Sequence, residues 1–477
     1  LMDLLKALQN RADGKDATIA ELRKKVRLKK PQTAGVQTEM DKKLQELVQA
    51  VNHQIELSSS SCEAPFMRKP EEFDDQGLGV YDAKKEFARQ GALSESSGWR
   101  ATSLNEEYGL CATYPSVVMV PKSVSDAQLE EVVKFRSKQR LPALSWFDSE
   151  THAAIIRCAQ PLVGALGKKS VADEEYFDEI IKANTQNRGI AMLDARPKVN
   201  AVANRGRGGG YEDIDRYDAG MATLIFLDIE NIHVMRGSNN EMHGLVASED
   251  RTDPIRRVDF QLGWLVHLGR LLGGAATIVR EVGDKKRTAL VHCSDGWDRT
   301  AQLCALSEIC LDPYYRTFDG FQVLCQREWL SFGHKFQDRV WGHKEKERSP
   351  VFLQFLDCVH QMIEEYPTAF EFNQSMLLFI LDSMYSLEFL ESRHNCEKPR
   401  TLAAQAEPPA GSTSMWRVAR AAFGARWWIH PLALITLERR RAWEIRPQPV
   451  GHARSRDFVR ASGEDRARIA QGGRVRR

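Results

Sequence analysis

Residues 291–300 read VHCSDGWDRT, and this stretch decides the fold that we expect for the chain. The apolar run 288–292 leads into it and is typical of a buried strand, and a helix is expected directly after it, over 299–311. A short loop between a strand and a helix N-terminus points successive backbone N–H groups inward, where the helix dipole also favours an anion. The stretch therefore predicts a phosphate-binding loop within an α/β domain.

Two residues of this loop suggest a reaction. Cys293 would lie over the N–H groups, which would stabilise its thiolate, and Arg299, after five intervening residues, can grip two phosphate oxygens with its planar guanidinium. Gly296 permits a sharp backbone path, and the Thr300 hydroxyl can donate to the cysteine sulfur. We expect in-line attack of the thiolate on phosphorus, followed by hydrolysis of the cysteinyl-phosphate. The alternative is a buried cysteine beside a helix that carries a surface arginine.

The loop also contains two carboxylates, Asp295 and Asp298, which should repel a phosphate unless they have a role. Protonation of the leaving oxygen is such a role. The thiolate reaction needs no metal, and no Asp/His cluster with metal-ligand spacing lies near the loop. We therefore expect neither a metal nor another cofactor.

The segments around the loop alternate between strands and helices, which indicates α/β layering. The expected strands are 116–121, 141–146, 153–157 and 224–229, and the expected helices are 126–138, 260–282 and parts of 351–390. No segment approaches the length of apolar sequence that spans a bilayer. Nine cysteines without a Cys-x-x-Cys pair fit a reducing compartment, and we expect a cytoplasmic protein.

The two ends of the chain differ from its middle. Residues 1–57 show helical spacing of leucine, isoleucine and valine, which fits either a coiled coil or a pair of surface helices; 58–79 resembles a linker. Residues 400–477 carry a net charge of +10, against +2 for the whole chain. This basic segment is either a solvated extension or a surface that binds acidic lipids or nucleic acid. We expect residues 451–477 to be disordered, and we do not expect nucleic acid as a partner.

Residues 292–300 resemble the signature of the myotubularin phosphoinositide 3-phosphatases, and the likeness continues along the chain. Segments with the same resemblance are 108–115, 135–138, 144–146, 160–164, 194–197, 200–204, 208–212, 231–236, 328–336 and 367–372. A weaker likeness at 415–416 and 430–443 extends the resemblance over 80–450. The resemblance implies a cysteine-dependent phosphatase domain with a central mixed sheet flanked by helices. In the chain, this domain follows the N-terminal helical extension.

The resemblance also implies a hydrolase that removes the 3-phosphate from phosphatidylinositol 3-phosphate and phosphatidylinositol 3,5-bisphosphate at endosomal or other cytosol-facing membranes. Cys293 matches the nucleophile and Arg299 the phosphate clamp, while Asp298, or else Asp295, matches the general acid. The residues that match the substrate pocket are Asn204, Asn231, Ile232, Ser294, Gly296, Trp297, Lys335 and Arg339. The alternatives are that the two asparagines cap turns, that the two cations are ordinary surface residues, and that Trp297 packs in the core or contacts the membrane.

The chain also departs from the family pattern. Members usually carry a PH-like GRAM domain ahead of the phosphatase domain, whereas the residues before position 80 show no β-pattern, so we expect that domain to be missing, truncated or lost with the true N-terminus. The segment 340–350 is shorter than in the family and 205–227 slightly longer. Competing functions are a protein phosphatase with the same chemistry and a scaffold that forms homo- or hetero-oligomers through the N-terminal helix.

Overall fold

The computed structural model describes residues 81–186, 188–218, 220–247, 263–386, 389–406, 414–416 and 418–419. The expected coiled coil over 1–57, the linker over 58–79 and the C-terminal tail lie outside the described residues. All elements given below belong to one compact unit of the chain.

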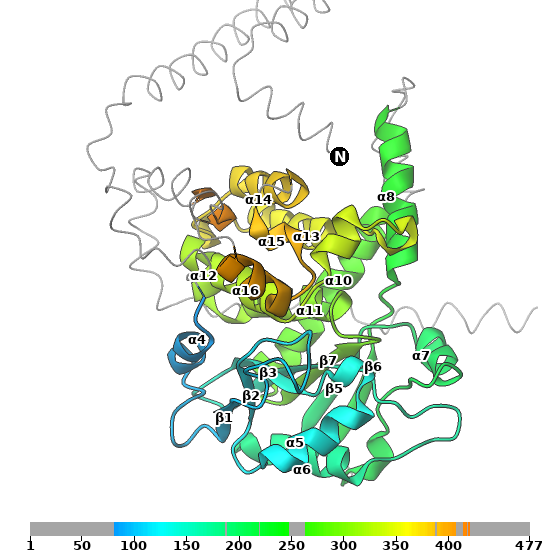
Figure 1. Ribbon diagram of the computed structural model, residues 1–477, viewed down its shortest axis with the longest axis vertical. Coiled ribbons are helices and arrows are strands. Elements are labelled where there is room, and N and C mark those ends of the chain that lie inside the picture. Colours follow the sequence, from blue (N-terminus) through cyan, green and yellow to red (C-terminus); the bar gives the residue numbers. More distant parts are fainter. Residues whose placement is uncertain are drawn as a thin grey trace, which may run out of the picture. The chain divides into compact units, whose positions relative to one another are not determined.

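The centre of the fold is a five-stranded sheet (Figure 1). Its strands, in spatial order, are β3 (Ala143–Phe147), β4 (Ala154–Ala159), β7 (Thr288–Cys293), β5 (Ile190–Asp194) and β6 (Ala222–Phe226). β3 pairs with β4 antiparallel, and the other pairs are parallel. The expected central mixed sheet is confirmed. Because four strands run in parallel, the loops that follow them gather at one edge of the sheet.

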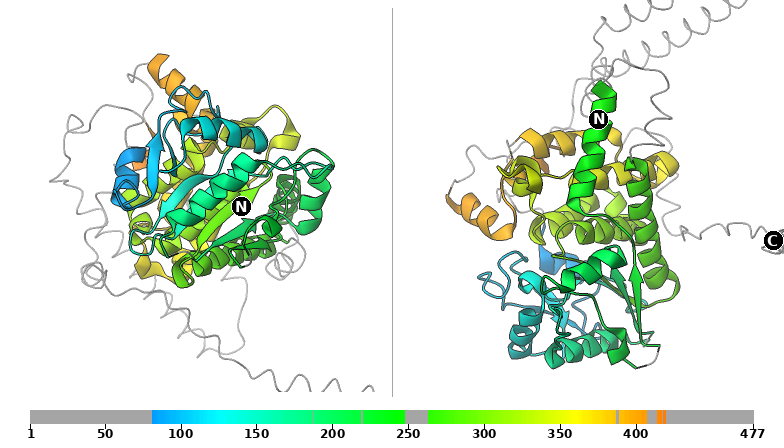
Figure 2. Two further views of the ribbon diagram at one scale, coloured as in Figure 1. Left: turned by 90° about the horizontal axis from the view of Figure 1, so that it is seen from below. Right: turned by 90° about the vertical axis from the view of Figure 1, so that its right-hand side faces the viewer.

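Helices lie on both faces of this sheet (Figures 1 and 2). One face carries α5 (Asp126–Val132) and α6 (Val171–Ala183) together with the ribbon of β1 (Trp99–Thr102) and β2 (Val118–Pro121). The other carries α10 (Trp264–Val279), α11 (Arg299–Leu311), α12 (Phe318–Cys325), α13 (Val351–Glu365) and α14 (Gln374–Ser386). The remaining α-helices are α4 (Ala83–Arg89), α7 (Lys198–Arg205), α8 (Ile232–Ala247), α15 (Leu390–Arg393) and α16 (Glu397–Ala406). Two π-helical turns matter for the site: η7 (Gln326–Ser331) and η8 (Gln337–Trp341).

The central strands are buried on both faces because each separates two apolar clusters. Successive side chains of a strand point to opposite faces, so Val291 joins the cluster on the α11 side and Leu290 the cluster on the α5–α6 side. Every residue of β7 is buried. Strands of this kind read as continuous apolar runs rather than alternating ones.

The sequence predicted β7 and α11 closely, but not every element. The helix expected over 126–138 ends as an α-helix at Val132, continues as a short 3-10 turn, and gives way at Arg136 to a bridge with Pro161. The buried Arg136 guanidinium donates to Asp173 at 2.7 Å and to Glu212 at 2.6 Å, so tertiary contacts replace the last helical turn. The central strand β5 was not predicted at all.

Candidate active site

The loop 293–299 connects the carboxyl end of β7 to the N-terminus of α11, as the sequence predicted. Gly296 has a φ of +76°, and a Cβ atom there would collide with the carbonyl oxygen of Cys158 on the neighbouring strand β4. Only glycine combines this conformation with so close an approach. The sharp path that we expected at Gly296 is therefore present, and it packs the loop against β4.

The Cys293 side chain is held within this loop. It is 3% exposed, and its Sγ accepts a hydrogen bond from the Gly296 backbone N–H at 3.3 Å. The sulfur thus lies on the N–H side of the loop, where an anion would also meet backbone N–H groups. The Thr300 hydroxyl is buried without a hydrogen-bond partner among the described residues, so the expected bond from Thr300 to Cys293 is not formed.

Two buried arginines fix the first half of the loop from behind. Arg140 and Arg157 both donate to the Gly296 carbonyl oxygen, at 3.0 and 2.9 Å. Arg140 also donates to the carbonyl of Phe332 at 2.7 Å, and Arg157 to the carboxylate of Glu328 at 2.6 Å. The loop is thereby tied to β4 and η7, and its carbonyl oxygen points away from the side where an anion would bind.

Arg157 is part of a larger buried ionic network. Arg327 donates to the other oxygen of Glu328 at 2.9 Å and also contacts Glu308 on α11 and Glu86 on α4. Burial lowers the pKa of Arg157, but the charge and hydrogen bond of Glu328, together with smaller contributions from Cys304 and Tyr114, raise that pKa above its usual value. The cations of this network therefore stay charged in the interior.

The second half of the loop is held by side-chain charges. Arg339 of η8 donates from Nε and Nη2 to the two carboxylate oxygens of Asp298, at 3.1 and 2.9 Å, and His334 Nδ1 lies 3.2 Å from Asp298 Oδ1. Burial raises the pKa of Asp298, but the charge of Arg339 and the hydrogen bonds from His334 and Arg339 hold that pKa well below its usual range. Asp298 is therefore a carboxylate at neutral pH in this state. Arg339 is only 5% exposed and is not an ordinary surface cation.

Asp295 and Ser294 contact other parts of the chain. Ser137 donates its hydroxyl to Asp295 Oδ1 at 2.9 Å. The Ser294 hydroxyl oxygen accepts from Asn204 Nδ2 at 3.3 Å, and its carbonyl accepts from the Gln160 N–H at 3.1 Å. The structure thus brings Asn204, at the end of α7, to the loop 293–299.

Arg299 reaches the segment that follows β6. Its Nη1 donates to the carbonyl oxygen of Ile229 at 3.0 Å. Asn231, two residues further, uses its side-chain oxygen to accept the N–H groups of His233 and Val234 at 2.9 and 3.3 Å and so caps α8. The Ile232 carbonyl accepts from the Ser349 hydroxyl at 3.0 Å. Asn231 and Ile232 therefore lie near Arg299, and the capping role that we considered for Asn231 is present.

Trp297 is 8% exposed and packs beneath cations. Lys335 Nζ lies 4.6 Å from the centre of its ring, and the guanidinium carbon of the buried Arg140 lies 5.7 Å from it. His334 Nδ1 lies 2.8 Å from the Trp297 carbonyl oxygen. This burial favours packing over contact with a membrane for Trp297. Lys335 also pairs with Asp338 at 3.2 Å.

The two comparisons with known proteins agree. The family model described as "Myotubularin-like phosphatase domain" matches residues 61–401. This chain belongs to that family. It is 48% identical to myotubularin of Xenopus laevis over 335 residues, which cover 69% of this chain and 55% of the relative. It is 47% identical to the phosphatidylinositol-3,5-bisphosphate 3-phosphatase MTMR2 of Mus musculus over 352 residues, which cover 72% and 53%. The chain thus spans about half the length of these relatives.

The myotubularin-like loop depends on residues that the sequence analysis did not select. Arg140, Arg157 and His334 lie 156, 139 and 37 residues from the loop atoms that they contact. A signal for Arg157 was available, because a charged residue within the buried run of β4 requires a partner. Arg140 and His334 carry no comparable signal.

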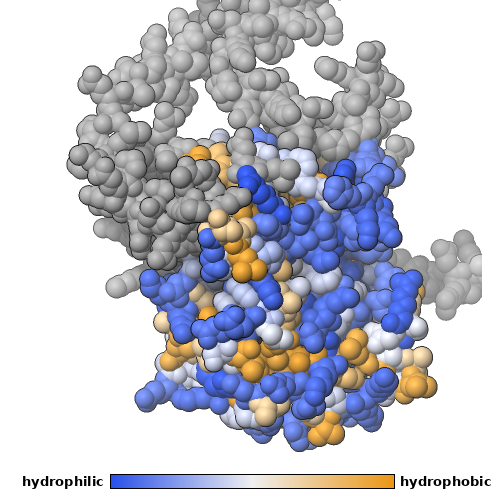
Figure 3. All heavy atoms as spheres, viewed as in Figure 1, coloured by the Kyte–Doolittle hydropathy of each residue, from blue (hydrophilic) through white to orange (hydrophobic). Residues whose placement is uncertain are grey.

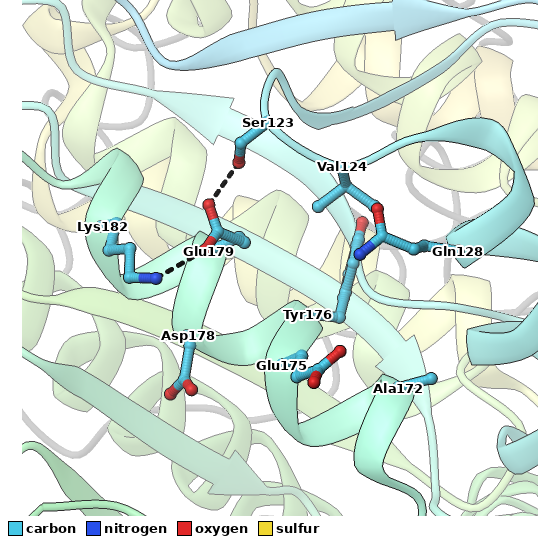
Figure 4. Close-up of a pocket in the computed structure, with 9 residues that line it drawn as sticks. All are labelled: Ser123, Val124, Gln128, Ala172, Glu175, Tyr176, Asp178, Glu179 and Lys182. Carbon is cyan, nitrogen blue, oxygen red and sulfur yellow. Dashed lines mark hydrogen bonds and ion pairs between the residues drawn. The ribbon is translucent and has the colours of Figure 1, made fainter.

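A surface hollow of about 290 Å³ between α5 and α6 is not the phosphatase site (Figure 4). Its carboxylates include Glu175, Asp178 and Glu179, and Glu179 is already bonded to Ser123 and Lys182. Asn184, just after α6, donates to the carbonyl of Lys286, which precedes β7. The hollow follows α6 from Ala172 to Lys182, no residue of the loop 293–299 lines it, and its excess of carboxylates would repel a phosphate.

The described residues contain neither a metal-binding cluster nor a helix that could span a membrane. Among them, no group of three or more His, Cys, Asp or Glu side chains could hold a metal ion. Within the same part of the chain, no helix combines the length and the apolar character needed to cross a bilayer.

Proposed function

We propose that this chain is a phosphoinositide 3-phosphatase that acts on phosphatidylinositol 3-phosphate and phosphatidylinositol 3,5-bisphosphate. The observation that carries the proposal is the loop 293–299, in which Cys293 Sγ faces the Gly296 N–H beside the N-terminus of α11. The printed activity of a relative that is 47% identical supports the choice of substrate.

In the first step, Cys293 Sγ forms a bond to phosphorus and the bond from phosphorus to the inositol oxygen breaks. Arg299 leaves the Ile229 carbonyl and grips two equatorial phosphate oxygens, which also meet the loop N–H groups. The leaving alkoxide needs a proton. In the second step, water attacks phosphorus, inorganic phosphate leaves, and the Cys293 thiolate returns.

Asp298 is the proposed proton donor, and the structure indicates what this role requires. Arg339 holds Asp298 as a carboxylate, so the carboxylate must lose this partner before it can carry a proton. A second phosphate on the inositol ring would compete with Asp298 for Arg339. In the second step, the same carboxylate would accept a proton from the attacking water. Asp295, which is bonded to Ser137, is the alternative donor.

The remaining candidates form the proposed walls of the substrate site. Asn204 and Ser294 lie on the α7 side of the loop, Asn231 and Ile232 on the α8 side, and Trp297 with Lys335 on the η8 side. We propose that Lys335 and Arg339 meet a second phosphate. Gly296 contributes its backbone N–H and the space that the absence of a side chain leaves.

We further propose a domain that extends over 80–450 and acts as a peripheral protein on endosomal or other phosphoinositide-bearing membranes. Residues 1–57 are the proposed interface for a homo- or hetero-oligomer. Light scattering on the full chain and on a chain lacking these residues would separate a monomer from an oligomer.

The decisive experiment is phosphate release from a panel of short-chain phosphoinositides, with a phosphotyrosine peptide as the competing substrate class. We expect release from lipids with a 3-phosphate only. Arg299→Lys should lose most of this activity because a point charge cannot make the bidentate contact. Faster release from the peptide would favour a protein phosphatase, and no release from any substrate would favour a scaffold.

A further inference from the structure

Two neighbouring segments form an exposed lobe beside the catalytic loop. We call residues 162–169 and 198–210, which include α7, the basic lobe. The Gly164 N–H donates to the Gly209 carbonyl at 2.9 Å, and Arg205 Nε donates to the Gly164 carbonyl at 3.5 Å, so the two segments are held together. In the view of Figure 1, α7 lies at the right-hand side of the sheet.

The basic lobe exposes large apolar side chains. Leu166 is 89% exposed, Val199 is 78% exposed and Val202 is 47% exposed. Leu166 lies between Gly164 and Gly167, which have φ angles of +62° and +66°. These left-handed glycines form a tight turn that presents Leu166 at its tip. Figure 3 shows such hydrophobic spheres among hydrophilic ones on the face that it draws.

The charges of the lobe have one sign. Its two segments contain five Lys or Arg residues and no Asp or Glu: Lys168, Lys169, Lys198, Arg205 and Arg207. The next two acids in the chain are already paired, because Glu212 binds Arg136 and Asp213 binds Arg216. No carboxylate within the lobe therefore neutralises its cations.

The lobe lies at the mouth of the site. Asn204 belongs to it and donates to Ser294 in the catalytic loop, and Gln160, just ahead of it, donates to the Ser294 carbonyl. A surface that combines exposed leucine and valine with cations matches the boundary between anionic headgroups and acyl chains. An acidic peptide would match the cations but would leave Leu166 without an apolar partner.

We propose that the basic lobe docks on an anionic bilayer, with Leu166, Val199 and Val202 entering the region below the headgroups while the lysines and arginines contact the headgroups. This inference deepens the proposed function, because it rests on a substrate that is embedded in a membrane. The docking would bring the catalytic loop to the lipid headgroup without any other domain of the protein.

The test is sedimentation of the full 477-residue chain with vesicles of phosphatidylcholine and phosphatidylserine. We expect Leu166→Asp, and the double variant Val199→Asp with Val202→Asp, to bind roughly 10-fold or more weakly, because burial of one such side chain is worth about that factor. The matched control is Leu402→Asp on α16, where the leucine is 56% exposed; Figure 1 draws the helix α16 apart from α7. It should bind as the unmodified chain does.

Two further measurements distinguish docking through the lobe from attraction by the basic C-terminal segment and from the proposed activity. The net charge of +10 on residues 400–477 would also attract anionic vesicles if that segment meets the bilayer, so the loss in Leu166→Asp should persist at raised ionic strength, where such attraction is screened. The kcat/KM for a soluble short-chain lipid should be unchanged in all variants. Unchanged vesicle binding by both lobe variants, or an equal loss in the Leu402 control, would overturn the inference. If the unmodified chain docks through the lobe but does not turn over the soluble lipid, the proposed activity fails and the docking surface stands.

Discussion

The two halves of the catalytic loop are held in different ways. In the first half, Gly296 is fixed through its backbone, by Arg140 and Arg157 on its carbonyl and by the close packing of its Cα against Cys158. In the second half, Asp298 is fixed through its side chain, by Arg339 and His334. The groups that hold the first half lie behind the anion site, whereas Arg339 is a cation that an anionic substrate would also attract.

The difference separates a preformed part of the site from a part that the substrate can rearrange. An anion in the loop would not compete with the contacts between the arginines and the Gly296 carbonyl. A highly charged headgroup would compete with Asp298 for Arg339, and release of Asp298 would let its pKa rise toward the range of a useful acid.

The largest effect is expected for Cys293→Ser in the preformed half. Phosphate release should fall by several orders of magnitude, because a serine hydroxyl is a much weaker nucleophile than a thiolate held by the Gly296 N–H. The thermal unfolding midpoint should stay close to that of the unmodified chain, as the side chains have similar size. Release that matches the unmodified chain would remove Cys293 from the mechanism.

Asp298→Asn tests the part that can rearrange. We expect turnover of a lipid substrate, whose alkoxide is a poor leaving group, to fall about 10²–10⁴-fold, the usual contribution of a general acid. An activated aryl phosphate needs less protonation and should lose less. An equal loss on the two substrates would show that Asp298 is not the acid, and Asp295→Asn would then be measured in the same assay.

Arg157→Met tests the support behind the first half. Removal of one partner from the buried pair with Glu328 should cost about 3–5 kcal/mol of unfolding free energy. Lys134→Met, which breaks an exposed pair with Glu131 at 2.5 Å, is the control and should cost at most about 1 kcal/mol. The measurement is chemical denaturation of both variants. A similar small cost for both would mean that the loop does not depend on the network beneath it.

The smallest effect is expected for Arg339→Ala. The kcat/KM for the bisphosphate lipid should fall about 10- to 150-fold, which corresponds to loss of a contact worth roughly 1.5–3 kcal/mol. The monophosphate lipid should lose less, because it offers no second phosphate to Arg339. Both substrates are measured at fixed ionic strength, since general attraction of anions would change them together.

The same variant gives a dependence on pH. Without Arg339, the burial that raises the pKa of Asp298 is opposed mainly by His334, so the pKa should rise. A reaction that needs protonated Asp298 loses activity as pH rises through this pKa, and the descending limb of the rate should therefore move to higher pH. An unchanged limb, or an equal fall for both lipids, would assign Arg339 a structural role only.

Much of the site could be predicted from the sequence because it is local. The strand β7, the loop and the helix α11 follow one another without a break, and their apolar run, glycine and helix start are all visible in one short stretch. The central strand β5 was missed although Ile190–Asp194 is a short apolar run after a glycine. Its alanine and methionine have little preference for strands, and its burial between β7 and β6 decides its conformation.

The contacts that hold the loop could not be predicted, because they join residues that are far apart in the sequence. The pair of Asp298 and Arg339 spans 41 positions, and the bond from Arg157 to Gly296 spans 139. The spacing of the motif indicates a phosphate clamp but not which charges neutralise the acids within it. Likewise, the one-sided charge of the basic lobe is visible in the sequence, whereas its contact with Ser294 is not.

The contacts of Arg140 constrain the order in which parts of the chain can fold. Its guanidinium joins the carbonyl groups of Thr113, Gly296 and Phe332, so three segments must be assembled before this contact exists. Contacts of such long sequence separation form slowly and late in folding. During synthesis, the loop around Cys293 would leave the ribosome before η7 and residue 332, and it would have to wait for them. Catalytic activity should therefore be among the last properties to return on refolding, later than the helical signal of α10 and α11, whose contacts are more local.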